Sequence, residues 1–129
     1  MASQWHSLVS QKIFLARNLL GQLEHSDSVP TQEALLQGSI ELGLRARKLT
    51  LVMIARVYQH KHSQPDDLEA LDELIGTHSP EMTELEQLAS DGRSWWSHLE
   101  QLERHQGNPP VTRKTVSNEN VIAVAADTG

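Results

Sequence analysis

The sequence predicts an all-α protein, a three- to four-helix antiparallel bundle followed by an extended C-terminal tail. The chain has 129 residues, which suits one domain. Aromatic residues make up only 4% of it, and runs of β-branched residues are few, which disfavours a sheet. Apolar residues recur at spacings of three and four, as on helix faces. We therefore expect a single helical-bundle domain over residues 1–108 and a flexible or docked tail over 109–129.

The first helix is predicted from Gln4 to His25, because its apolar residues follow a helical period. The segment from Ser26 to Pro30 should end it, since proline does not fit a helix interior and serine favours turns. The apolar stripe consists of Val9, Ile13, Ala16, Leu20 and Leu23, widened by Trp5, Leu8, Leu15 and Leu19.

The second helix is predicted from about Thr31 to His62. Between residues 49 and 58 it is apolar nearly all round, so this part should be buried on several sides or lie at a subunit contact. Gly38 and Gly43 lie inside the helix, where glycine costs up to about 1 kcal/mol relative to alanine. They indicate a close approach of a neighbouring helix or a local kink.

A short third helix is expected from Asp67 to Ile75, with acidic residues at its N-terminus, where the helix dipole favours negative charge. Gly76 is the expected stop. A fourth helix should then begin at Ser79 as N-cap, with Pro80 in the first helical position.

The fourth helix is predicted to continue unbroken to His105. Its apolar residues keep a heptad spacing across the possible break at Asp91 and Gly92. Trp95 lies in that seam and should be buried, whereas Trp96 lies off it. The seam consists of Leu85, Leu88, Gly92, Trp95, Leu99 and Leu102.

Composition excludes several classes of function. The net charge of −6 argues against nucleic acid as a partner, and the absence of cysteine removes disulfides and thiolate metal sites. We see no signal peptide and no apolar run long enough for a membrane span, so we expect a cytoplasmic protein. His60 and His62 lack the four-residue spacing of helical zinc ligands. We therefore expect no metal, no cofactor and no small-molecule ligand.

Charge is unevenly distributed along the chain. The segment 66–91 holds nine acidic residues and no lysine or arginine, while the predicted second helix carries five basic residues. The simpler interpretation is that these are solvated faces that attract each other within one molecule. The alternative is a basic patch for an anionic partner.

An enzymatic alternative uses Arg56 with His60 or His62. Helical RNA-acting nucleases of the HEPN type carry an arginine followed four to six residues later by a histidine, as this pair does. The pattern recurs at Arg93 and His98, and a chain with seven histidines produces it by chance. If the hypothesis holds, Arg56 and the two histidines should converge in one cleft.

The favoured hypothesis is a non-catalytic interaction or adaptor protein that binds a protein partner or itself. A homodimer would use residues 49–58 or the Trp96 side, because exposed apolar surface marks contacts. The apolar tail segment 121–126 should dock on its own bundle or on a partner. The candidate interaction residues are Arg56, Tyr58, Trp96, Val121, Ile122 and Val124.

Several short stretches resemble a bacterial, pseudomonad-type family known only as a domain of unknown function. They are residues 11–17, residues 79–85, Ser94 with Trp95, and the pair Pro109 and Pro110. The resemblance spans most of residues 4–110. It implies a compact all-helical protein and brings no catalytic residue with it.

Overall fold

A computed structural model of the chain describes residues 2–109, with side chains from residue 4 onward. This part of the chain forms five α-helices and one 3-10 turn, and it contains no strand. The all-α prediction is therefore confirmed. The elements are α1 (Ala2–Gln22), η1 (Leu23–His25), α2 (Val29–Val57), α3 (Leu68–Ile75), α4 (Pro80–Ser90) and α5 (Trp95–Gly107).

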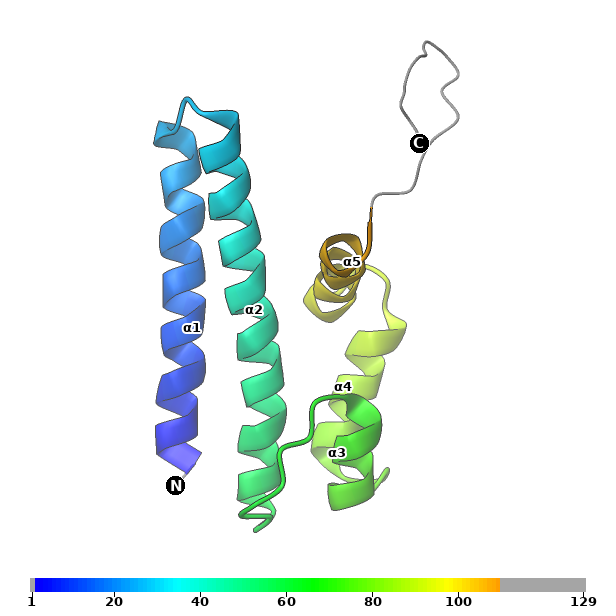
Figure 1. Ribbon diagram of the computed structural model, residues 1–129. Coiled ribbons are helices and arrows are strands. Elements are labelled where there is room, and N and C mark those ends of the chain that lie inside the picture. The colour runs from blue at the N-terminus through cyan, green and yellow to red at the C-terminus, as the bar shows by residue number, and fades with distance from the viewer. Residues whose placement is uncertain (1, 110–129) are drawn as a thin grey trace, which may run out of the picture.

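Helix α2 is the central element of the bundle. It runs antiparallel to α1 along nearly the whole length of both, and α3, α4 and α5 lie on its other side (Figure 1). The main contacts of α1 are with α2, whereas α2 also packs against α3 and α5. The end of the hairpin that carries η1 extends beyond α5 in Figure 1. Among residues 2–109, one side of α1 therefore has no neighbouring helix.

The predicted C-terminal end of the second helix is wrong by five residues, because α2 ends at Val57 rather than His62. Gln59 adopts a left-handed backbone conformation with φ of 72°, and the His60 N–H donates to the Ala55 carbonyl. This is the bonding pattern of a Schellman cap, which stops a helix even without glycine. The chain then turns toward α3.

Helix α3 begins and ends as its sequence predicts. The Asp67 side chain caps its N-terminus by accepting from the Ala70 N–H at 2.8 Å. Gly76 follows its last residue with φ of 93°, a conformation that L side chains rarely adopt. The predicted start of the next helix is also confirmed, since Ser79 caps α4 and Pro80 is its first residue.

The predicted single helix from Ser79 to His105 is wrong, because residues 91–94 divide it into α4 and α5. Ser94 causes the break. Its hydroxyl caps α5 by accepting from the Ser97 N–H at 3.1 Å, and it donates to the Leu88 carbonyl at the end of α4 at 2.6 Å. The Ser97 hydroxyl adds a bond to the Asp91 carbonyl. One serine thus satisfies backbone groups of two helix ends, as capping requires.

The break exchanges the two tryptophans relative to the sequence prediction. Trp96 is buried, with 4% of its surface exposed, while Trp95 is half exposed at 50%. The two rings meet edge to face, with centroids 5.6 Å apart. The heptad spacing runs through Gly92 in the sequence, but the structure does not follow it. The turn at residues 91–94 rotates α5 about its axis relative to α4. Gly92 itself has no close neighbour.

The main core lies where α2 meets the three short helices. Six buried side chains form it: Leu51, Ala55, Leu71, Met82, Leu85 and Trp96. The two glycines of α2 serve close packing, as the sequence predicts. A methyl group on Gly38 would lie 3.0 Å from Leu19 of α1, and one on Gly43 would lie 3.3 Å from Leu99 of α5. Both contacts are with the ends of leucine side chains, which would have to move by a few tenths of an ångström to admit a methyl group.

The exchanged tryptophans predict a specific order of stability losses. Trp96→Ala should lower the free energy of unfolding by about 3–5 kcal/mol, the usual cost of removing a buried aromatic ring. Trp95→Ala should cost less than half as much, because half of its surface is already in water. Urea denaturation followed by circular dichroism measures both. Equal costs, or a larger cost at Trp95, would contradict the orientation of α5.

Candidate functional site

The most elaborate polar contact in the described chain is made by Arg47 of α2. Its Nη2 atom lies 2.8 Å from Oε1 of Glu103, and its Nη1 atom lies 3.6 Å from Oε1 of Glu100. The guanidinium also stacks over the Trp96 ring, with 5.1 Å between its central carbon and the ring centroid. The Arg47 side chain is 14% exposed. This cation therefore joins α2 to α5 by charge and by aromatic stacking.

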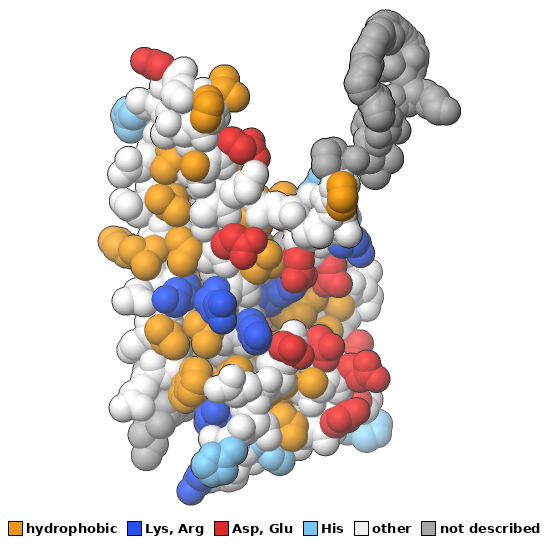
Figure 2. Space-filling model, viewed as in Figure 1, with side chains coloured by type: hydrophobic (Ala, Val, Ile, Leu, Met, Phe, Trp, Pro, Cys, Tyr) orange, Lys and Arg blue, Asp and Glu red, His pale blue; other side chains and the backbone are white. Residues whose placement is uncertain are grey.

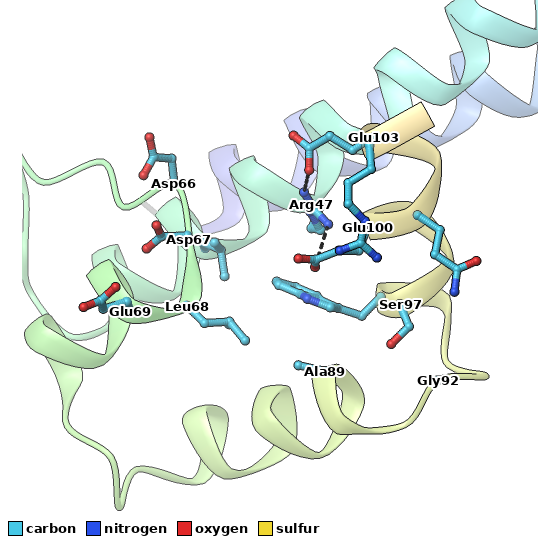
Figure 3. Close-up of a pocket in the computed structure, with 14 residues that line it drawn as sticks. Arg47, Asp66, Asp67, Leu68, Glu69, Ala89, Gly92, Ser97, Glu100 and Glu103 are labelled. Carbon is cyan, nitrogen blue, oxygen red and sulfur yellow. Dashed lines mark hydrogen bonds and ion pairs between the residues drawn. The ribbon is translucent and has the colours of Figure 1, made fainter. Parts of the chain in front are cut away.

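Beside Arg47 lies a groove of about 740 Å³ between the start of α3 and the face of α5 (Figure 3). Leu51, Leu68, Ala89 and Trp96 give it an apolar floor. Figure 3 shows Asp66, Asp67 and Glu69 along one wall and Glu100 and Glu103 along the other. Five carboxylates and only two guanidinium groups, of Arg47 and Arg104, line the groove.

A second hollow of about 420 Å³ continues from this groove. It shares Arg47, Asp66 and Glu103 with the groove and extends to Gln106 and Gly107 at the end of α5. The Nε2 atom of Gln106 is buried and has no hydrogen-bond acceptor within residues 2–109. Since buried amide groups normally find a partner, this atom marks an incompletely satisfied site.

Several large apolar side chains of α1 are exposed and are not covered by any other described residue. Phe14 is 68% exposed, and Ile13 and Leu20 are 45% and 44% exposed. A shallow hollow of about 520 Å³ lies on this face, lined by Ile13 and Phe14 with the polar side chains of Ser10, Arg17 and Asn18. We name Ile13, Phe14, Arg17 and Leu20 the α1 patch. The predicted buried stripe includes Ile13 and Leu20 but not Phe14. Apolar residues on several faces of this helix already indicate a second contact.

The basic and acidic side chains are unevenly distributed over the surface of the folded protein. Figure 2 shows lysine and arginine side chains gathered over the middle of the α1–α2 hairpin, and aspartate and glutamate side chains mostly over α3 to α5, with a few along the upper part of the hairpin. Arg47 pairs with Glu100 and Glu103 of α5, whereas the carboxylates of the acidic segment 66–91 form no ion pair within the described residues. The attraction between that segment and α2 stays a prediction.

Arg56, a predicted interaction residue, is occupied within the fold. Its Nη1 atom donates to the carbonyl oxygens of His60 and Ser63, at 2.7 and 2.6 Å. Its guanidinium stacks over the Trp5 ring of α1, 5.0 Å from the centroid. Arg56 therefore fixes the turn after α2 and attaches it to the start of the chain.

Tyr58 and Glu81 form a contact between the end of α2 and the first turn of α4. The Tyr58 hydroxyl donates to the Glu81 carboxylate. Three effects raise the pKa of Tyr58 above its ordinary value of 10.0. The largest is this hydrogen bond, the second is the removal of the hydroxyl from water, and the third is the negative charge of Glu81. A hydrogen bond with Ser79 acts in the opposite direction. Tyr58 thus has a structural partner as well.

The residues of the nuclease hypothesis have different partners in the structure. Nε2 of His60 lies 2.8 Å from the Leu74 carbonyl oxygen, to which its N–H donates. His62 is exposed, and Arg56 binds main-chain carbonyls. None of the three lines the groove at Arg47. Among residues 2–109 no group of three or more histidine, aspartate or glutamate side chains is placed to hold a metal ion.

Trp96, the remaining described candidate, is 4% exposed and contributes to the floor of the groove. Val121, Ile122 and Val124 lie outside the described residues, as does the apolar tail segment 121–126. Within residues 49–58, Leu51, Val52 and Ala55 are covered within one chain, whereas Val57 is 53% exposed, so the dimer contact stays a prediction.

Comparison of the chain with models of protein families, with curated proteins and with solved structures finds no match. The resemblance to a pseudomonad-type family therefore stays a prediction. Within the part of the chain that the structure describes, no helix combines the length and apolarity needed to cross a membrane.

The bond between Tyr58 and Glu81 predicts a shifted titration. Because the folded-state pKa is raised, the contribution of this bond to stability is fully present below pH 10 and is lost as the pH rises through the folded-state pKa. The chain has one tyrosine, so tyrosinate absorbance reports it alone. The midpoint should lie above 10.0 and fall toward that value in Glu81→Ala. Glu84→Ala, at an exposed position nearby, is the control and should leave the midpoint unchanged. An unchanged midpoint in Glu81→Ala would refute the assignment.

Proposed function

We propose that this chain is a non-catalytic interaction protein of the cytoplasm, and that the α1 patch binds an amphipathic helix of another protein. The observation that carries the proposal is the exposure of Phe14 and Ile13, which line one hollow together with Arg17 on a helix that packs mainly against α2. Large apolar side chains exposed together commonly mark a protein contact. Laying an apolar helix face onto it is an established mode of recognition.

The charge on α1 specifies the partner's chemistry. Residues Ala2–Gln22 include Lys12 and Arg17 and no aspartate or glutamate. Arg17 lines the hollow with Ile13 and Phe14, and it forms no ion pair within the described residues. A partner helix should therefore carry a carboxylate among its apolar side chains, because a charge at a contact favours its opposite.

The same arginine argues against a second copy of this chain as the occupant. A twofold-symmetric contact through the α1 patch would bring the patch of one chain onto the identical patch of its partner, and with it two copies of Arg17. Like charges at a contact cost free energy. The engagement of Arg56 and His60 with main-chain carbonyls supports a structural rather than a catalytic role for them.

The proposal is tested with two labelled peptides that form amphipathic helices of equal length and equal leucine content. One has glutamate beside its apolar face and the other has lysine. In fluorescence anisotropy the glutamate peptide should bind more tightly, and Phe14→Ala should weaken it about tenfold, equivalent to about 1.4 kcal/mol. Arg17→Ala should remove most of the preference between the peptides.

Thr83→Ala, at an exposed position on α4, is the matched control and should leave binding unchanged. Equal affinity for both peptides, or no effect of Phe14→Ala, would contradict the proposal. A dimer in sedimentation that Phe14→Glu dissociates would replace the foreign helix with a second copy.

A further inference from the structure

We propose that the apolar segment 121–126 of this chain docks where α2 and α5 meet, on a surface formed by Leu36, Trp95, Leu99 and Leu102. We name these four residues the α2–α5 surface. The inference is independent of the α1 patch. It rests on the exposure of this surface, on its lack of charge and on the place where the chain leaves α5.

Three large apolar side chains of the α2–α5 surface are exposed to water. Trp95 is 50% exposed, Leu36 is 39% exposed and Leu102 is 38% exposed. Tryptophan is the residue that most often anchors a contact, and half of this ring has no cover within the described chain.

Helical spacing brings these side chains together around Leu99. A methyl group on Gly43 would lie 3.3 Å from the Leu99 side chain, so the two helices meet there. Trp95 precedes Leu99 by four residues and Leu102 follows it by three, so all three share one face of α5. Leu36 precedes Gly43 by seven residues, which places it on the same face of α2, two turns nearer η1. Figure 1 shows α2 continuing past α5 in that direction.

The α2–α5 surface is bordered mainly by uncharged residues. On α5, the neighbours of Leu102 one turn away on its face are neutral polar or apolar, namely His98, Leu99, His105 and Gln106. On α2, the corresponding neighbours of Leu36 are Gln32, Ser39, Ile40 and Glu33, whose carboxylate accepts from Gln37. By contrast, Arg17 borders the α1 patch and five carboxylates line the groove at Arg47. Covering charges with apolar side chains costs free energy, so this surface suits an uncharged occupant best.

The segment 121–126 has the matching chemistry and lies within reach. It consists of six consecutive apolar residues, among them Val121, Ile122 and Val124. The chain leaves α5 at Gly107, five residues beyond Leu102. Twelve peptide units separate Pro109 from Val121 and can span up to about 40 Å. The whole of α5 is about 20 Å long, so the segment can reach every part of the surface.

Attachment to the same chain favours this segment over a separate molecule. A segment on a short linker has an effective concentration of the order of millimolar at a nearby site. A separate protein at micromolar concentration would need an affinity about a thousandfold higher to reach the same occupancy. A small apolar contact, too weak to recruit another chain, is therefore enough for docking within one chain.

The absence of cysteine makes a direct test possible in the full chain, since Thr128→Cys introduces a single site for a nitroxide spin label two residues beyond the segment. The label should broaden the indole N–H resonance of Trp95, which Trp95→Phe identifies. The indole of Trp5 is the internal control, because it lies against Arg56 near the start of α1. We expect the Trp95 signal to lose several times more intensity than the Trp5 signal.

Substitutions on both sides of the contact then test its chemistry. Ile122→Asp with Val124→Asp should restore the Trp95 signal, whereas Asn118→Asp with Asn120→Asp adds the same charge outside the segment and should not. Leu36→Glu, at an exposed position, should also restore it. Phe14→Glu is its matched control on the α1 patch and should leave the broadening unchanged. The peptide test of the α1 patch thus fails or succeeds separately.

Three results would overturn the inference. The first is equal broadening, or none, at Trp95 and Trp5 in the labelled protein. The second is broadening that survives Leu36→Glu or is removed by Phe14→Glu, which would place the segment elsewhere. The third is broadening that appears only when labelled chains are mixed with isotope-enriched, unlabelled chains, which would place the segment on a second copy.

Discussion

The position of Arg47 is the constraint on which the arrangement of the helices depends. Its side chain leaves α2, stacks on Trp96 and pairs with Glu100 and Glu103, so one cation contacts three side chains of α5. A cation that is mostly removed from water is costly unless it is paired. The stacking and the ion pairs compensate that cost only in one orientation of α5 across α2. The apolar core of Leu51, Leu71 and Met82 then closes beneath this contact.

Ser94 makes that orientation possible. By bonding the end of α4 and the start of α5 together, it turns the chain and rotates Trp96 toward α2. Without the turn, a straight helix would present Trp95 to the core and leave the Trp96 ring away from Arg47. The hydrogen bonds of Ser94 thus determine whether Trp95 or Trp96 is buried. They thereby also determine the shape of the groove.

The helical elements of this chain could be predicted from sequence wherever capping and period agreed, as at Ser79 with Pro80 and at Gly76. Prediction failed where a side chain bonds groups that lie several residues away or on another helix. The end of α2 depends on a left-handed Gln59 and on Arg56 bonding carbonyls four and seven residues on, and neither has a local signature. The groove could not be predicted because Arg47 and Glu103 meet only after folding. The α1 patch contains Ile13 and Leu20, and their helical spacing predicts that both are buried. Spacing alone does not show whether another helix of the chain packs against them.

The central claim, that Arg47 and Trp96 together hold α5 on α2, is tested most directly by a double-mutant cycle. Arg47→Met and Trp96→Leu keep much of each side chain's apolar volume while removing the cation and the aromatic face. Urea denaturation of the parent, both single variants and the double variant gives the coupling free energy. The account predicts a favourable coupling of about 0.5–2 kcal/mol, as for a largely desolvated cation–aromatic pair. Losses that add to within about 0.3 kcal/mol would show that the two side chains act independently and would contradict it.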